Sequence, residues 1–332
     1  MINELKEIMK IQGVSSREGK IGAKLAEMVK PYVDKVSIDP LGNVIAVKRG
    51  KAKAPKKIMF CAHMDEIGFV VNYIQDNGLV RVSIVGGINF AAAAFTRVVF
   101  ENGARGVIVP EGKVEPKDYA PDKFYIDLGV KTKRDAERKV KIGETLALES
   151  DCVKLGGQTY AGRPFDDRIG CYVLTETAKK LKDTENDIYF VFSVQEEVGC
   201  RGALPAAFSI APDYALCFDV TGTGDTPAAT PMACSLGGGA AIKIKDGSVI
   251  CSGEVVAKLQ KLATENKITS QNEILLYGGT DTSVLQAAGI GAYAGCISIP
   301  SRYIHSGVEM IDLRDVDACT DLATAFALDP TL

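Results

Sequence analysis

The feature that most constrains the fold of this chain is residues 188–199, which read IYFVFSVQEEVG. The first seven of these residues are apolar or small and rich in β-branched and aromatic types. That composition is typical of a strand buried on both faces of a parallel sheet. The strand pattern ends at Glu196 and Glu197. Because consecutive strand residues point to opposite faces, adjacent acidic residues here indicate two different roles.

Taken alone, the Glu196-Glu197 pair is more typical of a solvated loop, since glutamate is rarely buried without a partner. However, the carboxyl end of a strand is where an open α/β sheet binds its ligands. The chain has only two histidines, His63 and His305, and each follows a predicted strand. The positions of the other acidic residues therefore decide between the two interpretations.

Strand and helix patterns alternate over residues 1–67 and again over 158–332. This alternation predicts an α/β domain with a mostly parallel sheet flanked by helices. Between them, residues 68–157 hold short β-rich runs separated by turn signals, which predicts an inserted small all-β domain, a barrel or a sandwich. Within the insertion, residues 111–138 are expected to form a polar, partly disordered loop or a partner-facing segment. A length of 332 residues suits two such units.

Composition excludes several classes of protein. The formal net charge of -3 argues against a nucleic-acid surface. No apolar run approaches the ~20 residues that span a bilayer, and the amino terminus is not a signal peptide, so we expect a cytoplasmic protein with no membrane partner. The nine cysteines form no Cys-x-x-Cys pair, and we expect them to be reduced.

Acidic and imidazole side chains stand at or just after successive predicted strand ends. They are His63, Asp65, Asp166, Asp167, Glu196, Glu197, Asp219 and His305. Such a set, without thiolates, suits zinc, cobalt or manganese. It contains more ligands than one tetrahedral ion takes, which favours two ions sharing a bridging carboxylate.

Each member also has a simpler interpretation. A lone histidine after a strand is commonly a hydrogen-bonded loop residue. Asp166-Asp167 could cap a helix, and Asp219 could cap a turn. Their coincidence at neighbouring strand ends, together with both histidines of the chain, favours the metal site.

At the level of motifs, the chain resembles the M42 metallo-aminopeptidases, which include tetrahedral and glutamyl aminopeptidases. Seven motifs carry the resemblance in order: 41–46 (LGNVIA), 62–69 (AHMDEIGF), 165–170 (FDDRIG), 194–199 (VQEEVG), 218–221 (FDVT), 278–281 (GGTD) and 297–306 (ISIPSRYIHS).

The resemblance implies an aminopeptidase with two divalent metal ions per subunit, zinc, cobalt or manganese. The residues implied as metal ligands are His63, Asp166 and Asp219 for one ion and Asp166, Glu197 and His305 for the other, with Asp166 bridging. Glu196 would be the general base that activates a metal-bridging water, and Asp65 would orient a histidine ligand.

The same resemblance implies a substrate site and an assembly. Gly279, Thr280 and Asp281 would belong to the substrate site. The substrates would be short peptides. The insertion would be a PDZ-like or barrel-like oligomerisation domain, and dimers would build a tetrahedral homo-dodecamer.

Three other functions remain open from the sequence. A glycoside hydrolase could use two carboxylates, but adjacent glutamates aimed oppositely flank one bond poorly, and the chain has no tryptophan for stacking sugars. A non-catalytic binding module would be expected to lack some ligands. A related metallo-carboxypeptidase or deacylase is the nearest competitor, although its second domain typically follows the later ligands, whereas here the insertion lies between His63 and Asp166.

Overall fold

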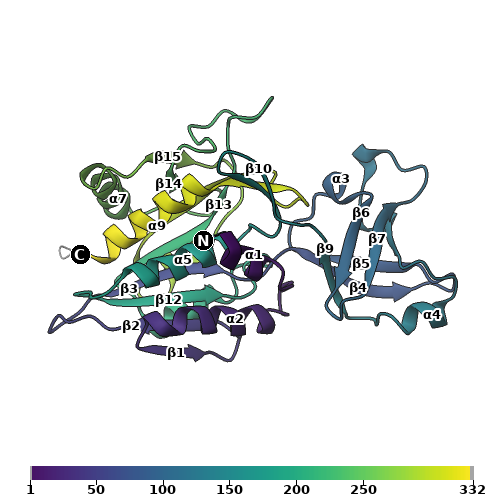
Figure 1. Ribbon diagram of the computed structural model, residues 1–332, viewed down its shortest axis with the longest axis horizontal. Coiled ribbons are helices and arrows are strands. Elements are labelled where there is room, and N and C mark those ends of the chain that lie inside the picture. Colours follow the sequence, from purple (N-terminus) through teal and green to yellow (C-terminus); the bar gives the residue numbers. More distant parts are fainter. Residues whose placement is uncertain (1, 330–332) are drawn as a thin grey trace.

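The computed structural model describes residues 2–329 and contains two units, a large α/β unit and a smaller β-barrel unit (Figure 1). Both ends of the described chain belong to the large unit, and the barrel unit extends from one side of it. None of the helices within residues 2–329 has the length and apolar character that a membrane crossing requires.

The large unit is built on an eleven-stranded sheet in the order β1-β2-β12-β3-β13-β16-β17-β11-β10, with β14 and β15 branching from β16. In this order the strands are β1 (Lys35–Ile38), β2 (Val44–Lys48), β12 (Asp187–Ser193), β3 (Lys57–His63), β13 (Tyr214–Thr221), β16 (Tyr293–Arg302), β17 (Glu309–Asp312), β11 (Thr159–Gly162) and β10 (Val153–Gly156); the branch holds β14 (Ala240–Lys245) and β15 (Ser270–Ile274).

The predicted α/β class is confirmed, but parallel pairing is confined to part of the sheet. The central strands β12, β3, β13 and β16 are parallel neighbours, and so are β14 and β15. The flanking pairs are antiparallel. Within the parallel centre, Ser193 lies opposite His63. The carboxyl ends of these strands therefore meet at one edge, as the position of the acidic residues requires.

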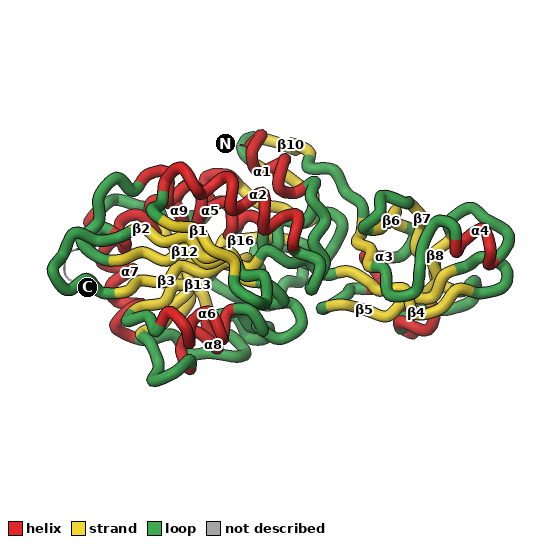
Figure 2. Tube along the Cα trace, turned by 90° about the horizontal axis from the view of Figure 1, so that it is seen from below, coloured by secondary structure: helices red, strands yellow, loops and turns green. Residues whose placement is uncertain are grey.

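Helices cover both faces of the sheet (Figure 2). One face packs against α1 (Ile2–Met9), α2 (Gly19–Val29), α5 (Arg168–Lys180), α7 (Gly253–Glu265) and α9 (Leu313–Ala327); the other packs against α6 (Ala203–Ile210) and α8 (Thr282–Ala287). A short 3-10 helix, η1 (Lys30–Tyr32), follows α2.

Alternate residues of β3 supply both cores. Phe60 joins the larger core and packs edge-on against Phe190 and Phe218, at ring-centroid distances of 5.9 and 5.4 Å. Its neighbours Met59 and Cys61 face the smaller core beside α6 and α8. This burial on both faces explains why the strand reads as a continuous apolar run.

The barrel unit is a closed six-stranded barrel in the order β4-β5-β8-β7-β6-β9, with antiparallel neighbours. Its elements are β4 (Gly68–Ile74), β5 (Val80–Val85), α3 (Phe90–Ala93), β6 (Thr96–Phe100), β7 (Arg105–Pro110), η2 (Pro116–Asp118), η3 (Pro121–Lys123), β8 (Phe124–Asp127), α4 (Lys133–Glu137) and β9 (Thr145–Leu148). It encloses a core of its own, so the prediction of an inserted all-β unit is confirmed.

The prediction of a partly disordered loop is wrong for part of residues 111–138, whereas the alternative of a partner-facing segment stays a prediction. This segment contains β8, which completes the barrel between β5 and β7, and the helix α4. Phe124 and Ile126 are buried in the barrel core, and the residues between and after them are half-buried. A strand of four residues carries too short an alternation to stand out from the polar residues around it.

The second boundary of the insertion also differs from the predicted residue 157. The last barrel strand ends at Leu148, and β10 pairs with β11 in the large sheet. We propose that the chain divides into a catalytic unit and an inserted unit, with the second boundary at residues 149–152. Sequence patterns missed this because β10 is a short, exposed strand that resembles those of the barrel.

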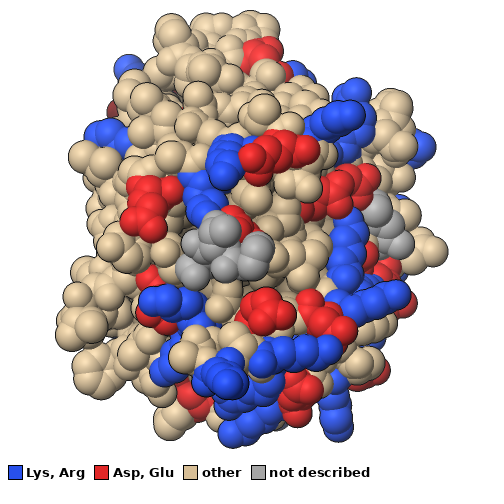
Figure 3. All heavy atoms as spheres, turned by 90° about the vertical axis from the view of Figure 1, so that its left-hand side faces the viewer, with Lys and Arg blue, Asp and Glu red and all other residues tan. Residues whose placement is uncertain are grey.

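Charges of both signs are interspersed on the face shown in Figure 3. Surface pairs such as Lys180–Asp321, 2.6 Å apart, are typical of such a surface. An exposed pair of this kind contributes only about 0–1 kcal/mol to stability.

Candidate metal centre

Three neighbouring strands deliver the candidate residues to one edge of the sheet. His63 is the last residue of β3, Asp219 lies near the end of β13, and Glu196 and Glu197 follow β12. The adjacent strand β16 leads into the turn that carries His305. Asp166 precedes α5, which packs beside β3 and β13.

The His63 half of the centre is buried. The Nε2 atom of His63 lies 3.1 Å from Asp166 Oδ1 and 3.8 Å from Asp219 Oδ1. On the other side of the ring, Nδ1 lies 3.1 Å from the Asp65 carbonyl oxygen and 3.4 Å from the Asp65 carboxylate. The His63 side chain is only 2% exposed, so its orientation is fixed by the sheet and by Asp65.

The His305 half is assembled from loops. His305 Nε2 lies 3.1 Å from Asp166 Oδ2 and 3.4 Å from Glu197 Oε2. Its side chain is 32% exposed, and its φ of 62° is in the left-handed region that few non-glycine residues adopt. The two oxygens of Asp166 thus face different histidines. This is the arrangement that a bridging carboxylate requires.

The adjacent aspartates have separate roles. The Asp167 side chain accepts a hydrogen bond from Gly170 N at 3.0 Å and caps α5. The backbone of Asp166 is held by Glu309, whose Oε2 accepts from Asp166 N at 3.1 Å. The capping interpretation is therefore correct for Asp167, and Asp166 is the member whose side chain lies between the histidines.

Asp65 organises the turn that carries both glutamates. Its carboxylate accepts hydrogen bonds from Glu196 N at 2.9 Å, Glu197 N at 3.3 Å and Ser15 Oγ at 2.6 Å. Asp65 is fully buried. The family resemblance implies only that Asp65 orients a histidine. In the structure its carboxylate also fixes the direction of the Glu196-Glu197 turn.

The two glutamates point in different directions. Glu197 faces His305 and Asp166, whereas Glu196 Oε1 accepts a hydrogen bond from the Cys200 thiol at 3.3 Å. Burial raises the pKa of Glu196 to about 8, with Asp281 and Glu197 adding to the shift and His63 opposing it.

The donor set fits divalent cations. The ligand atoms of His63, Asp166 and Glu197 lie within 4.8 Å of one another, as do those of His63, Asp167 and Asp219. Asp167 is the less suitable ligand because its carboxylate accepts hydrogen bonds from Gly170 N and His63 N. Glu197 Oε1 is buried, and no residue within 2–329 gives it a hydrogen bond.

Electrostatics support the same fit. Burial raises the pKa of Asp219 well above its usual range, and the nearby Asp167 adds to the shift. Burial opposes protonation of His305, yet Asp166 and Glu197 raise its pKa to about 11. The clustered carboxylates repel one another and favour protonation of the groups beside them. Bound cations would offset this repulsion.

A cavity of about 390 Å³ opens over these residues. Gly279 and Thr280, two of the three residues predicted for a substrate site, line it. Asp281 does not: it is 1% exposed and accepts a hydrogen bond from Ser193 Oγ at 2.6 Å. Asp281 is the N-cap of the short helix α8, which packs against β13 and β16, and its carboxylate is directed at Ser193 and the Cys61 thiol inside the molecule.

The barrel unit contributes to this cavity. Gly87, in the loop after β5, lines it, and a Cβ at this position would lie 3.1 Å from His305 Nδ1. At Gly86, a Cβ would lie 3.3 Å from Glu197 Oε2. The sequence analysis missed these glycines, although a Gly-Gly pair after a strand is the signal of a close backbone approach.

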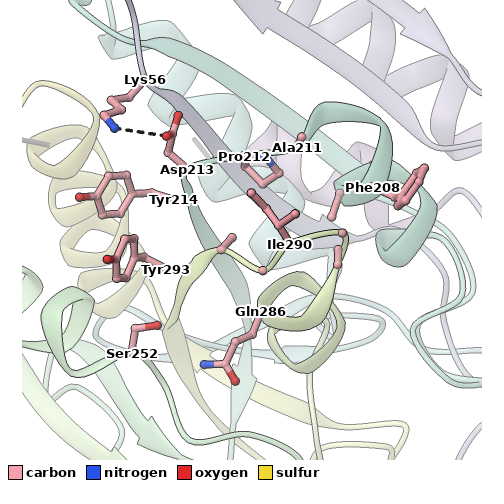
Figure 4. Close-up of a pocket in the computed structure, with 15 residues that line it drawn as sticks. Lys56, Phe208, Ala211, Pro212, Asp213, Tyr214, Ser252, Gln286, Ile290 and Tyr293 are labelled. Atoms are coloured by element: carbon pink, nitrogen blue, oxygen red, sulfur yellow. Dashed lines mark hydrogen bonds and ion pairs between the residues drawn. The ribbon is translucent and has the colours of Figure 1, made fainter.

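A second hollow lies at the opposite end of the central strands (Figure 4). It is lined by Phe208, Ile290 and the stacked rings of Tyr214 and Tyr293, and its Lys56–Asp213 pair is 3.3 Å apart. Tyr214 and Tyr293 begin their strands. This hollow is therefore remote from the carboxyl ends of the strands and from the candidate ligands.

Comparison with known proteins identifies the family of this chain. Residues 42–322 match the family model described as M42 glutamyl aminopeptidase. A putative aminopeptidase of Acetivibrio thermocellus is 46% identical over 97% of both chains. An aminopeptidase of the archaeon Desulfurococcus kamchatkensis superposes with a TM-score of 0.95 at 36% identity, over 99% of this chain and 94% of that one.

A Pyrococcus horikoshii TET1 peptidase, described as able to assemble into a tetrahedron or a large octahedral shell, has a TM-score of 0.87 at 31% identity over 99% of both chains. The match to the family model covers most of the chain, and the fold is shared throughout. The predicted family is confirmed: the chain is a hydrolase that belongs to the M42 family of aminopeptidases.

Proposed function

We propose that this chain is a two-metal aminopeptidase that removes free N-terminal residues from peptides. His63, Asp166 and Asp219 would hold one divalent ion, and Asp166, Glu197 and His305 the other. The observation that carries the proposal is the position of Asp166, whose two oxygens each lie 3.1 Å from a different histidine. Zinc, cobalt and manganese all suit these donors.

Divalent ions at this centre would polarise the scissile carbonyl and stabilise the charge that develops on it. Glu196 would take a proton from the attacking water and return it to the leaving amine. Its position on the cavity wall supports that role. Asp65 would hold Glu196 in place through the backbone hydrogen bond described above.

The experiment that tests the activity compares free and blocked peptides. We expect aminoacyl p-nitroanilides to be hydrolysed in the presence of zinc, cobalt or manganese and their N-acetylated forms to be resistant. Chelation should abolish hydrolysis, and added metal should restore it. Equal rates on acetylated substrates would favour a deacylase or carboxypeptidase, and activity that survives chelation would contradict the proposal.

The glycoside hydrolase alternative is weaker. Glu197 faces His305 and Asp166, whereas Glu196 faces Cys200, so the two carboxylates are not arranged to flank one bond. We also propose that the subunits form a homo-oligomer in which dimers build a tetrahedral dodecamer, as the similarity to the TET1 peptidase suggests. The subunit number can be measured by sedimentation equilibrium.

A further inference from the structure

The cavity above the metal centre adjoins a neighbouring hollow on the same side of the molecule. We call the first the metal lobe, of about 390 Å³, and the second the aromatic lobe, of about 420 Å³. Leu275, Ile304 and His305 line both, so the two lobes are adjacent and share a wall, and we call them together the cleft. A peptide whose scissile bond lies at the metal centre would have its two flanking side chains within this cleft.

Apart from the carboxylates and histidines of the centre, the metal lobe has an uncharged lining. Val220, Leu275 and Ile304 supply its apolar surface. Ser248 is one of its polar groups, and its hydroxyl already donates to Asp246 at 2.9 Å. A charged substrate side chain would therefore meet no unpaired opposite charge on this surface.

The aromatic lobe presents Tyr277 and Tyr303, both about half exposed or more, beside Leu275 and Ile304. Its charged lining residue is Arg302. That guanidinium makes two hydrogen bonds to Asp225, Nε to Oδ1 at 3.0 Å and Nη2 to Oδ2 at 2.7 Å. A bidentate pair of this kind neutralises the arginine, so the lobe is apolar in effect.

We infer that the cleft selects uncharged, apolar side chains on both sides of the scissile bond. This inference rests on the proposed function and names its substrate class. A charged side chain would lose its water on entering the cleft without gaining a partner. The family model is described by glutamyl specificity, whereas the lining of this cleft favours neutral residues.

The first test is a panel of aminoacyl p-nitroanilides and of Leu-X-Ala tripeptides. We expect kcat/KM for leucine or methionine to exceed that for glutamate, aspartate or lysine by about 100-fold, comparable with the loss of well-matched pocket contacts. Equal or faster cleavage of the charged residues would overturn this inference alone. No cleavage of any free N-terminal residue would instead contradict the proposed function.

A charge placed in the wall should change the preference. Leu275→Lys is expected to raise the ratio of glutamate to leucine turnover about 10-fold or more, because one new charge would pair with the acidic side chain. The matched control is Leu276→Lys, since Leu276 is 61% exposed and lines neither lobe. Thermal unfolding and metal content should be measured for both variants. An unchanged ratio in a folded, metal-loaded Leu275→Lys variant would overturn the inference.

A second variant tests the aromatic lobe without adding a charged residue. Asp225→Asn keeps the acceptor for Leu236 N but removes the negative charge paired with Arg302. In one of the two substrate series, we expect kcat/KM for substrates with acidic residues to rise about 5- to 10-fold, mainly through a lower KM. The reason is that the charge of Arg302 would no longer be compensated. Unchanged ratios in both series would overturn the assignment of this lobe to the substrate.

Discussion

The two histidines have opposite surroundings. His63 ends a central strand, is 2% exposed, and has its second ring nitrogen close to a backbone carbonyl. His305 lies in a left-handed turn, is 32% exposed, and faces a glycine of the barrel unit. One half of the centre is thus built into the sheet and the other is closed by loops. In the proposed two-metal centre, we expect the ion on the His63 side to be held more firmly.

The largest effect is expected from Asp166, the residue common to both halves. Asp166→Asn removes the bridging charge, so both ions should bind poorly and turnover should fall at least about 10³-fold. The matched control is Asp167→Asn, because asparagine also caps helices well. Metal content by plasma mass spectrometry and kcat check both variants. Metal loss in the Asp167 variant alone would reverse the roles assigned to the pair.

The glutamate pair separates binding from proton transfer. Glu196→Gln should retain both ions and lower kcat about 10²- to 10⁴-fold, since it removes only the general base. Glu197→Gln should lose the ion of the His305 half. Metal stoichiometry measured beside kcat distinguishes the two, and equal metal loss in both variants would contradict this division.

We expect the two ions of the proposed centre to be released one after the other as the pH falls. Although burial opposes protonation of both rings, Asp166 and Asp65 raise the pKa of metal-free His63 well above its usual range, and Asp166 and Glu197 raise that of metal-free His305 to about 11. A bound ion must therefore displace a proton at either ring. The His305 ring is 32% exposed and the His63 ring 2%, so the ion beside His305 is the one we expect to be held less firmly. Falling pH favours the protonated imidazole and weakens metal binding, by about 10-fold per pH unit for each competing proton. We expect one ion per subunit to leave first during dialysis at decreasing pH. His305→Ala should already lack that ion, and simultaneous release of both ions would remove the contrast between the halves.

A smaller effect is expected from the residue that supports the buried half. Asp65→Asn removes one of the acceptor oxygens that hold the Glu196-Glu197 turn. By analogy with groups that orient metal ligands, we expect a loss of about 10- to 100-fold in activity or metal affinity. Kinetics at saturating metal separate the two contributions. Wild-type activity and wild-type metal affinity in this variant would show that the backbone alone fixes the turn.

The smallest effect concerns the loop half. Gly87→Ala would place a Cβ 3.1 Å from His305 Nδ1 and displace the ring by a few tenths of an ångström. We expect a decrease in kcat of a few-fold, about 2- to 5-fold, because the group moves without losing its ligand atom. Gly112→Ala is the control in the same unit, since no atom of the described part of the chain lies within 4 Å of the added carbon. A similar decrease in both variants would point to the barrel fold instead.

The sequence predicted those parts of the molecule that have a strong local pattern. The strands that end at His63 and Ser193 are long apolar runs, and their adjacent carboxyl ends followed from the rule for parallel sheets. The short strand β8 was missed because four residues carry little periodicity. Asp281 was misplaced because a glycine-rich turn does not indicate which way the next side chain points.

Long-range contacts could not be predicted from local pattern. The role of Asp65 depends on backbone groups 131 residues away, and Gly87 approaches a histidine from another unit. The two aspartates illustrate the same limit. Their sequence is compatible with a cap or a ligand, and only the position of α5 relative to β3 assigns one role to each.

The loop at Gly86 and Gly87 limits which amino-acid substitutions the barrel unit can accept. An inserted unit is usually free to vary at its loops, because its own core keeps it folded. Here two barrel glycines leave no room for side chains beside Glu197 and His305. The barrel can therefore diverge over most of its surface, but a replacement module would have to offer bare backbone at this one edge. If the barrel unit were deleted, the chain would still contain every strand of the large sheet, but the cavity over the candidate metal centre would lose one wall.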